Sequence, residues 1–442
     1  SVASRGLGDV YKRQIMTSPK ETLKALYEAA VRAAHPASCL PPYLPAPHPE
    51  GRLILLAGGK AAGSMTKVAE EIYINQYGLD ASRLTGLAIT RTGYGEPTQI
   101  IRMVEAGHPL PNEAGLQATQ DLLALARSAT EHDQVLVLLS GGASANWIAP
   151  VKGLTLADKQ ALTRALLRSG APIDAMNTVR KRLSAIKGGR LCVAAYPAPV
   201  TTLAISDIPG DDPTHLGSGP TVPDTTTQAE ALEILQHYRI DLPDPIKALL
   251  SDPANDTPKA DHPAFAVSHL TLIARPDDGV KAAAALAQSL GYEVISLGAD
   301  LEGEARDIAR AHAALALEAA AAGRKCAIIS GGELTVTMHG DGRGGPGQEY
   351  ALALALALQG HPAIMAVAGD TDGTDGGAGQ PDDPAGAFVF PDTLARAAAC
   401  GMDAQKRLDN NDSTRFFEAI GDLLCPGPTG TNINDIRVIL VG

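Results

Sequence analysis

Three segments of this 442-residue chain share one pattern, an apolar strand that runs into a pair of glycines. The segments are LILLAGGK (53–60), LVLLSGGAS (137–144) and AIISGGELT (327–335). Alanine- and leucine-rich stretches with helical character lie between such strands, at 113–129, 155–169 and 301–322. This alternation of strands and helices is typical of βαβ units. The pattern therefore predicts an α/β fold built on parallel sheets.

The chain is longer than the about 250–300 residues at which one hydrophobic core stops growing, so we expect two domains. A stretch rich in Pro, Asp and Thr at 222–264 places the boundary near residue 265, giving domains 16–264 and 265–442. Residues 1–15 are interpreted as a non-native or disordered leader, with Met16 as the native start. Strands are expected at 53–57, 86–90, 135–139, 200–205, 270–274, 293–297, 326–329 and 363–368.

YALALALAL (350–358) alternates as a strand would, but Ala and Leu are strong helix formers. Pro346 followed by Gln348 and Glu349 resembles a helix N-terminus, which favours a buried helix here.

Composition excludes several classes of protein. A net charge of −12 disfavours binding to nucleic acid or anionic lipid, so an anionic ligand needs a local basic pocket. A mean hydropathy of +0.00 and short apolar runs argue against a membrane span. The five cysteines form no CxxC pair, which fits reduced thiols in the cytoplasm.

The glycine-floored strand ends are the first candidate site. Ligands bind beyond the carboxyl ends of strands in open α/β sheets, and exposed amides there favour phosphate. The candidate residues of two of these loops are Ser140, Gly141, Gly142, Ser330, Gly331 and Gly332. Each pair of glycines alone could merely form a tight turn, but three together indicate one composite anion site. AGGKAAGSM lacks the spacing of a Walker A loop, so an ATP site would be of another kind.

Four charged residues beside these loops are candidates for chemistry. Lys60 follows the first strand and could hold a carboxylate or phosphate, and Arg343 offers a planar fork for the same groups. Asp207 and Asp372 follow later strands, where a carboxylate can bind Mg²⁺ or act as a general base. The alternatives are solvated side chains for the two cations and ordinary turn formation for the two acids.

Two further patterns leave alternatives open. GDGRGG (340–345) matches GxGxxG between a potential strand, LTVTM, and a helix, which keeps a dinucleotide site as a minority interpretation. NTVRKRLSAIKGGR (177–190) is expected to be a helix whose basic residues form a solvated face. A role for Arg180 and Lys187 at the site is the less favoured alternative.

Eight motifs, in order, closely resemble the type II glycerate kinase family, the glycerate 2-kinases with a C-terminal MOFRL domain. The resemblance covers nearly all of residues 17–442, and its motifs are GGKAAG (58–63), AGHPLPNEAG (106–115), LLSGGASA (138–145), NTVRKRLSAIKGGRL (177–191), SDIPGDDPTHLGSGPTVPD (206–224), GRGGPGQE (342–349), DTDGTDGG (370–377) and TGTNINDIRVIL (429–440).

The resemblance implies a larger Rossmann-like N-terminal domain, a smaller α/β MOFRL domain and an active site in the cleft between them. It implies transfer of phosphate from ATP to D-glycerate, with Mg²⁺, giving 2-phosphoglycerate. Lys60, Asp207, Arg343 and Asp372 match polar positions of the family's cleft, with Asp207 and Asp372 as the metal candidates.

The resemblance extends the substrate-binding set to Ser218, Gly219 and Glu333. Gly347 departs from the family, which usually has Asn there, and this puts the fine substrate or nucleotide preference in doubt. A homodimer is compatible with the sequence. Two alternatives remain, an NAD(P)H-dependent hydroxypyruvate reductase, a label that some relatives carry, and a non-catalytic sugar-acid binding protein.

Overall fold

The computed structural model describes residues 18–377 and 380–442, and it divides the chain into two compact units. The parallel-sheet unit is Pro36–Ile273, and the mixed-sheet unit combines residues 18–35 with Ala274–Gly442. The expected domains 16–264 and 265–442 differ from this division in two places: the boundary lies nine residues later, and residues 18–35 belong to the second unit. The interpretation of residues 1–15 as a leader falls outside the described residues.

The first helix, α2 (Pro19–Ala34), joins the mixed-sheet unit because its apolar face needs a partner that the neighbouring sequence does not supply. Leu23, Leu26 and Tyr27 are buried in one core with Val280 of helix α12 (Pro276–Ser289). The Tyr27 hydroxyl donates to the carbonyl of Asp370 at 2.7 Å. Contacts across the whole length of the chain therefore hold this helix.

The sheet of the parallel-sheet unit has the order β3-β2-β1-β4-β5-β6, which is the order of a doubly wound, dinucleotide-type sheet. All four pairings that link β3, β2, β1, β4 and β5 are parallel. The strands are β1 (Leu53–Gly58), β2 (Leu84–Arg91), β3 (Arg102–Ala106), β4 (Gln134–Ser140), β5 (Val200–Ile205) and β6 (Ser268–Ala274). Five of these six match the expected strands, and β3 was missed.

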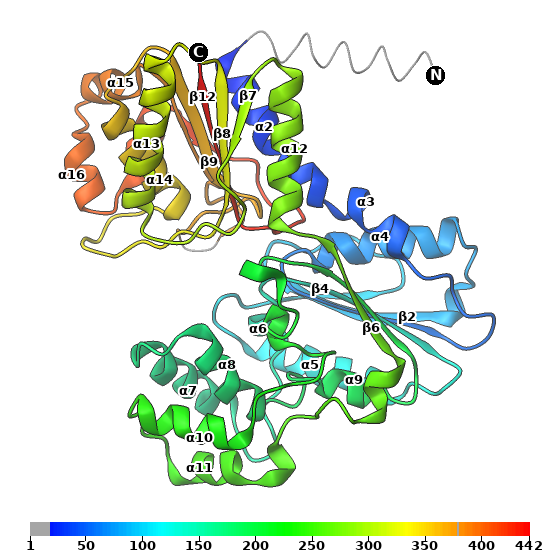
Figure 1. Ribbon diagram of the computed structural model, residues 1–442. Helices are drawn as coiled ribbons and strands as arrows, with labels where there is room; N and C mark the ends of the chain where they lie inside the picture. The colour runs from blue at the N-terminus through cyan, green and yellow to red at the C-terminus, as the bar shows by residue number, and fades with distance from the viewer. Residues whose placement is uncertain (1–17, 378–379) are drawn as a thin grey trace. The chain divides into compact units, whose positions relative to one another are not determined.

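Helices cover both faces of this sheet. α5 and α9 share a core with one set of strand side chains, and α4 packs against β1, β2 and β4 outside that core. A second cluster of helices, α7, α8, α10 and α11, drawn in teal and green in Figure 1, has its own small core. The helices of this unit are α3 (Pro36–Cys39), α4 (Ala62–Asn75), α5 (Glu113–Arg127), α6 (Ala143–Asn146), α7 (Leu156–Arg168), α8 (Ile173–Arg182), α9 (Arg190–Ala195), α10 (Gln228–His237) and α11 (Asp244–Ser251).

Helix starts in this unit follow capping chemistry that the sequence carries. The Asn112 side chain accepts a hydrogen bond from the Gly115 amide at 3.0 Å and begins α5. Thr155 with Asp158, and Thr227 with Glu230, form reciprocal capping boxes at α7 and α10. Such caps satisfy backbone donors that the first helical turn leaves without partners. The expected helices at 113–129 and 155–169 are confirmed to within two residues at each end.

The mixed-sheet unit has the strand order β11-β10-β9-β12-β8-β7. The last strand of the chain, β12, lies between β8 and β9 and runs antiparallel to both, so this sheet is not the purely parallel one that the repeated pattern predicts. The strands are β7 (Glu293–Ser296), β8 (Cys326–Gly332), β9 (Ile364–Asp370), β10 (Gly386–Val389), β11 (Leu423–Leu424) and β12 (Asp435–Val441). The sequence patterns identified β7, β8 and β9 and missed the other three.

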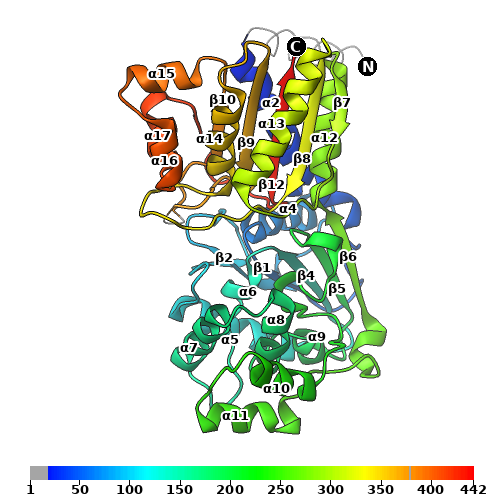
Figure 2. The same ribbon diagram turned by 60° about the vertical axis from the view of Figure 1, so that its left-hand side comes forward.

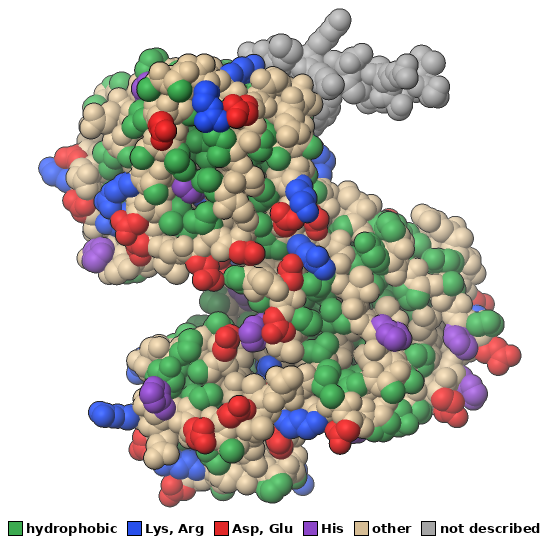
Figure 3. Space-filling model, in the orientation of Figure 1, with side chains coloured by type: hydrophobic (Ala, Val, Ile, Leu, Met, Phe, Trp, Pro, Cys, Tyr) green, Lys and Arg blue, Asp and Glu red, His purple; other side chains and the backbone are tan. Residues whose placement is uncertain are grey.

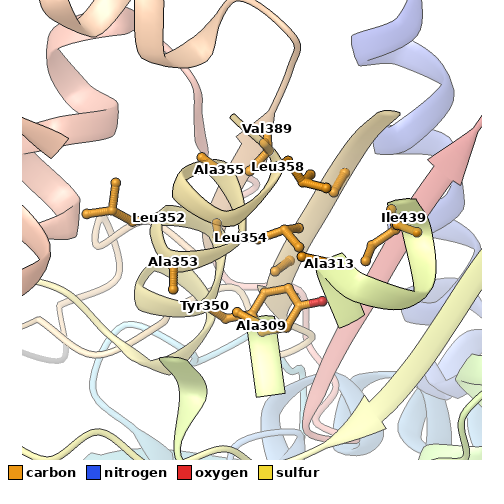
Figure 4. Close-up of a cluster of buried hydrophobic side chains, with 14 of the residues drawn as sticks. Ala309, Ala313, Tyr350, Leu352, Ala353, Leu354, Ala355, Leu358, Val389 and Ile439 are labelled. Carbon is orange, nitrogen blue, oxygen red and sulfur yellow. The ribbon is translucent and has the colours of Figure 1, made fainter. Parts of the chain in front are cut away.

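α2 and α12 share a core on one face of the mixed sheet, and α13 and α14 share a core on the other (Figures 1 and 2). The expected helix at 350–358 is confirmed as part of α14, which begins at Pro346 and is buried along most of its length. Figure 4 shows its Tyr350, Leu354 and Leu358 packed with Ala313 and Ile439. The remaining helices of the unit are α13 (Ala305–Ala321), α14 (Pro346–Leu358), α15 (Thr393–Ala399), α16 (Ala404–Asp409) and α17 (Ser413–Ile420).

Over the described residues, no helix combines the length and the apolar character needed to cross a membrane. Acidic and basic side chains are interspersed on the face of the molecule shown in Figure 3. All five cysteines are free thiols, and Cys39, Cys192 and Cys326 are buried.

Candidate active site

The loops that follow β1 and β4 are joined to each other. The Lys60 amide donates to the Gly141 carbonyl at 2.8 Å, and the Ala61 amide donates to the Ser140 hydroxyl at 2.9 Å. Gly59 has a φ of +113°, and a β-carbon there would lie 2.4 Å from the Ser140 carbonyl oxygen. Glycine is therefore required for this close approach. Two of the three predicted loops form one continuous surface at the carboxyl edge of the parallel sheet.

Lys60 lies where these two loops meet. A β-carbon at Gly142, which has a φ of +84°, would lie 3.1 Å from the Lys60 Cγ and 3.2 Å from the His108 Nε2. The lysine stem and the imidazole thus both face the glycine that begins α6. Lys60 is neither fully buried nor fully exposed, so its ammonium group can reach a ligand. The sequence patterns gave His108 no role, although it is the one titratable side chain of the loop 107–112 that follows β3.

The predicted Ser218 and Gly219 form a strained turn beside the same loops. Gly217, Ser218 and Gly219 have successive φ values of +57°, +64° and +61°. A positive φ is costly for serine, and such strain persists only where the surroundings hold it. Here the amides of Gly188 and Gly189 donate to the carbonyls of Ser218 and Gly219 at 3.0 and 2.7 Å. The Ser218 hydroxyl lies 2.8 Å from that of Ser144, which follows the β4 loop.

Asp207 lies two residues beyond the end of β5 and is partly exposed. β5 pairs with β4 in parallel, Ser140 opposite Ile205, so Asp207 emerges at the same edge of the sheet as the Ser140–Gly142 loop. A partly exposed carboxylate at a parallel-strand end can serve as a general base or a metal ligand.

The third predicted loop does not form a phosphate cradle. Ser330, Gly331 and Gly332 belong to strand β8 and are paired with β12, and Glu333 is exposed just beyond it. The buried Arg437 guanidinium donates to the Ser330 hydroxyl at 3.0 Å and to the carbonyls of Gly331 and Gly332. The Gly331 amide donates to Gly298 at 2.9 Å. The prediction of an anion cradle at Gly331 is therefore wrong, because an internal arginine and a neighbouring strand already satisfy this segment.

The glycines of GDGRGG allow the segment to pack against two other loops of its own unit. β-Carbons at Gly340 and Gly344 would lie 2.2 Å from Asn410 and from Ser413, and one at Gly345 would lie 2.4 Å from Asp375. Arg343 is fixed in its backbone by bonds to Asp412 and Thr414. Its guanidinium donates to the buried Asp383 carboxylate at 2.8 Å, but its side chain is 51% exposed, so donors remain for a ligand.

The N-terminus of α14 is occupied by a carboxylate of the protein. Asp375 accepts hydrogen bonds from the amides of Gly347 and Gln348 at 3.1 and 2.7 Å. In a dinucleotide fold, the pyrophosphate takes this position at the helix that follows GxGxxG. LTVTM also contributes only an isolated bridge at Thr335 and no strand. The GxGxxG match in residues 340–345 is therefore not the loop of a βαβ dinucleotide site.

Asp372 is buried and engaged in a turn. Its Oδ1 accepts from the Thr374 amide and hydroxyl at 2.8 and 3.0 Å, and its exposure is 1%. This arrangement matches the alternative interpretation, turn formation, better than a role in direct contact with ligand. Within residues 18–377 and 380–442, no three His, Cys, Asp or Glu side chains gather as a metal-binding group.

The basic run 177–190 departs from its prediction as a solvated helical face. α8 ends at Arg182, because the Lys159 ammonium donates to the carbonyls of Arg180 and Leu183 at 3.0 and 3.1 Å and caps the helix there. Lys181, Arg182 and Lys187 are buried. These charges therefore lie inside the parallel-sheet unit, where Asp224 is the carboxylate between Lys181 and Arg182.

The free energy of unfolding is expected to depend on pH through Asp375. Burial, and then the neighbouring Asp435, raise the pKa of Asp375 to about 7. Because the folded pKa exceeds the unfolded value of about 3.9, the folded state binds the extra proton between these pH values. The free energy of unfolding of the wild type relative to Asp375→Asn should therefore fall as pH rises from about 4 to about 7, and level off above. Denaturant titrations of both proteins at several pH values measure this difference.

Comparing the two proteins removes the titration of groups that do not interact with Asp375, among them His312, whose pKa burial lowers to about 4. A pH-independent difference would show that Asp375 is ionised throughout and that its two amide bonds outweigh its burial.

Comparisons with known proteins place this geometry in a family. Residues 22–251 match a family described as a domain of unknown function (DUF4147), and residues 326–435 match the MOFRL family. A D-glycerate 2-kinase of Thermotoga maritima is 38% identical over 395 residues, covering 88% of this chain and 91% of that protein. The chain belongs to the glycerate kinase family. The recognition made from sequence motifs is confirmed.

Two further comparisons extend the match. A crystal structure of a glycerate kinase from Thermotoga maritima superimposes with a TM-score of 0.84 at 36% identity, covering 96% of this chain and 99% of that one. A protein of Agrobacterium vitis named putative hydroxypyruvate reductase is 44% identical over 431 residues, covering 96% of this chain and 95% of that protein. As a member of the glycerate kinase family, the chain is an enzyme of the kinase class with the expected α/β fold.

Proposed function

We propose that this enzyme transfers the γ-phosphate of ATP to the 2-hydroxyl of D-glycerate, giving 2-phosphoglycerate and ADP. The observation that carries the proposal is the position of Lys60 in a chain of the glycerate kinase family. Its backbone and the stem of its side chain lie at the junction of the two glycine loops, where exposed amides and an ammonium group together favour an anion. The free thiols support a reducing, cytoplasmic location.

The reaction needs positioning and neutralised charge more than covalent chemistry. The 2-hydroxyl oxygen forms a bond to the γ-phosphorus, the bond to the β,γ-bridging oxygen breaks, and the hydroxyl proton passes to Asp207. Lys60 and Arg343 hold the glycerate carboxylate and the transferring phosphate, and the Ser140–Gly142 loop lines the anion site. Asp372 acts indirectly, by shaping the loop 370–374.

The donor set fits Mg²⁺ through one carboxylate. Mg²⁺ in kinases takes one or two protein carboxylates and completes its shell with phosphate oxygens and water, so it needs no cluster of three protein ligands. Asp207 is partly exposed at the sheet edge and would hold it, whereas the burial and turn bonds of Asp372 disfavour that residue. When bound, the ion would neutralise the charge of the transferring phosphate.

A second candidate, hydroxypyruvate reductase, is favoured by the name of the Agrobacterium vitis relative. The Asp375 carboxylate at the N-terminus of α14 argues against the dinucleotide site that this activity would need at residues 340–345. The kinase is therefore the better-supported function.

Incubation of the purified enzyme with ATP, Mg²⁺ and D-glycerate is expected to yield 2-phosphoglycerate, which phosphorus NMR distinguishes from the 3-phosphate. A parallel incubation with hydroxypyruvate and NADH or NADPH should leave the nicotinamide absorbance unchanged. Oxidation of the nicotinamide without any ATP-dependent product would make the reductase the correct function, and binding of glycerate without either reaction would indicate a non-catalytic role.

A further inference from the structure

Three segments of the parallel-sheet unit meet at the side chain of Ser144. Lys187, from the loop after α8, donates its ammonium protons to the Ser144 carbonyl at 2.7 Å and to the Ser144 hydroxyl at 2.5 Å. The Ser218 hydroxyl lies 2.8 Å from the same hydroxyl. Ser144 itself lies two residues beyond Gly142, the glycine that Lys60 and His108 both face. Ser144 therefore lies close in the chain to the loop already assigned to anion binding, and it also contacts the turn at Ser218.

Ser144 is the member of this trio that can meet a ligand. Lys187 and Ser218 are each 1% exposed, whereas Ser144 is partly exposed. The Ser144 oxygen accepts a proton from Lys187, and it can accept a second from Ser218. The Ser144 proton then points away from Lys187 and Ser218. The hydroxyl can therefore donate this proton to a ligand while the Lys187 ammonium lies on its other side. Hydrogen bonds assisted by a charge are about twice as strong as neutral ones.

Several cations lie in the part of the unit that contains Lys187, the lysine bonded to Ser144. Within this part of the unit, the ion pairs recorded for the basic side chains go to two carboxylates, Asp224 and Asp256, and Asp212 also lies near Lys181. The cations are Lys159, Arg180, Lys181, Arg182, Lys187 and Arg190. Lys187 is the one that contacts Ser144, and Arg180, Lys159 and Lys181 act on Lys187, so the group as a whole favours an incoming negative charge at Ser144.

The surrounding positive charges affect the pKa of Lys187. Burial, and then Arg180, Lys159 and Lys181, lower its pKa well below the ordinary value. Lys187 makes no ion pair with a carboxylate in the described part of the chain, and its bonds go to Ser144. An anion bound at Ser144 would supply the counter-charge that this ammonium lacks.

We propose that the Ser144 hydroxyl binds an oxyanion of the substrates, and that Lys187 and Ser218 position and polarise that hydroxyl. The oxyanion is either a phosphate oxygen of the nucleotide or the carboxylate of the hydroxy acid, since a hydroxyl donor beside a buried cation suits both. The inference rests on the proposed kinase function. Ser144 contacts the ligand, whereas Lys187 acts only through Ser144.

Steady-state kinetics of Ser144→Ala and Lys187→Met test this assignment. Each variant should raise the KM for one substrate about tenfold or more and leave the KM for the other close to the wild-type value. The substrate whose KM rises identifies the oxyanion. Ser144→Thr, which keeps a hydroxyl, should restore most of the lost affinity, which a merely structural role for Ser144 would not predict.

Lys159→Met is the matched control. Lys159 is equally buried and its pKa is lowered to about 7, but among the described residues its ammonium donates to the carbonyls of Arg180 and Leu183 and not to Ser144. Because its replacement removes one charge of this group but no hydrogen bond to Ser144, it should lower stability and change the KM of either substrate far less than Lys187→Met does. If Lys187→Met fails to fold, Ser144→Ala decides the question alone. Unchanged KM values for both substrates in folded Ser144→Ala would overturn the inference.

Failure of the proposed kinase activity can be distinguished from failure of the inference about Ser144. Calorimetric titration of the wild type and Ser144→Ala with inorganic phosphate and with D-glycerate measures the same contact without turnover. Weaker binding of either probe by the variant supports the inference even if the wild type transfers no phosphate. Equal binding by both proteins, or no binding by either, contradicts it.

Discussion

Replacing Arg343 with alanine is expected to lower kcat/KM for glycerate phosphorylation by about 10²–10³-fold, the usual cost of one lost charge-stabilising donor. Arg343 keeps about half of its side chain exposed while one nitrogen binds Asp383 at 2.8 Å. Its other donors are therefore free to contact a carboxylate or a phosphate. Arg343→Lys keeps the charge but not the planar fork, so it should retain part of the activity.

The Arg343→Ala variant also affects Asp383, the partner of Arg343, whose side chain is 1% exposed. Alanine at position 343 leaves this buried carboxylate without its cation, so the single variant should also lose stability. The double variant Arg343→Ala with Asp383→Asn should regain stability and stay inactive. Arg324→Ala, which removes an exposed arginine paired with Glu293, should behave as the wild type. Full activity in the double variant would rule out the role assigned to Arg343.

Replacing Asp224 with alanine is expected to destabilise the parallel-sheet unit by about 3–5 kcal/mol, the usual cost of removing one partner from a buried ion pair. Asp224 is buried between Lys181 at 3.3 Å and Arg182 at 3.8 Å, and it also accepts from the hydroxyls of Thr226 and Thr257. The variant would leave two buried cations short of a counter-charge. Denaturant unfolding should show a lower midpoint at an unchanged slope.

Unfolding measurements of the wild type and Asp224→Ala at several pH values test the same ion pair in a second way. Burial acts to raise the pKa of Asp224, but Lys181 and the two threonine hydroxyls outweigh it and lower the value. Because the folded pKa is depressed, the stabilisation is present at neutral pH and is lost as pH falls through the folded pKa. The difference between wild type and variant should therefore shrink in acid. Asp241→Ala, at an exposed pair with Lys247, should have no measurable effect, and equal effects at both positions would contradict the argument.

Local sequence patterns predicted eight of the twelve strands of the described residues and a smaller share of the helices. All eight expected strands exist, because each is a run of apolar residues ended by glycine or a polar turn, and such runs are read from neighbouring residues alone. β12 was missed although it is the centre of its sheet. Its buried Arg437 interrupts an apolar run, and the bonds that satisfy this arginine come from Ser330, Gly331 and Gly332, about a hundred residues away.

The candidate site was predicted in part. The pattern strand–Gly–Gly identified the joined loops around Lys60 and Ser140, because the carboxyl ends of neighbouring parallel strands must meet at one edge. The same pattern misled at Ser330–Gly332, where the glycines make room for Leu301 and the carbonyls bind Arg437. A pair of glycines indicates close approach, and it does not say what approaches.

The sequence by itself determined the α/β class, the family and the positions of the loops that carry Lys60, Asp207 and Arg343, since these depend on local periodicity and on long ordered motifs. Only the tertiary structure decided which charges lie inside. Lys181, Arg182 and Lys187 look like a solvated helical face in the sequence, yet they lie in the interior, where they bond to Asp224 and Ser144, residues distant along the chain. Burial of a charge depends on partners that sequence spacing does not reveal, and for this reason the contact between Ser144 and Lys187 emerged from the fold alone.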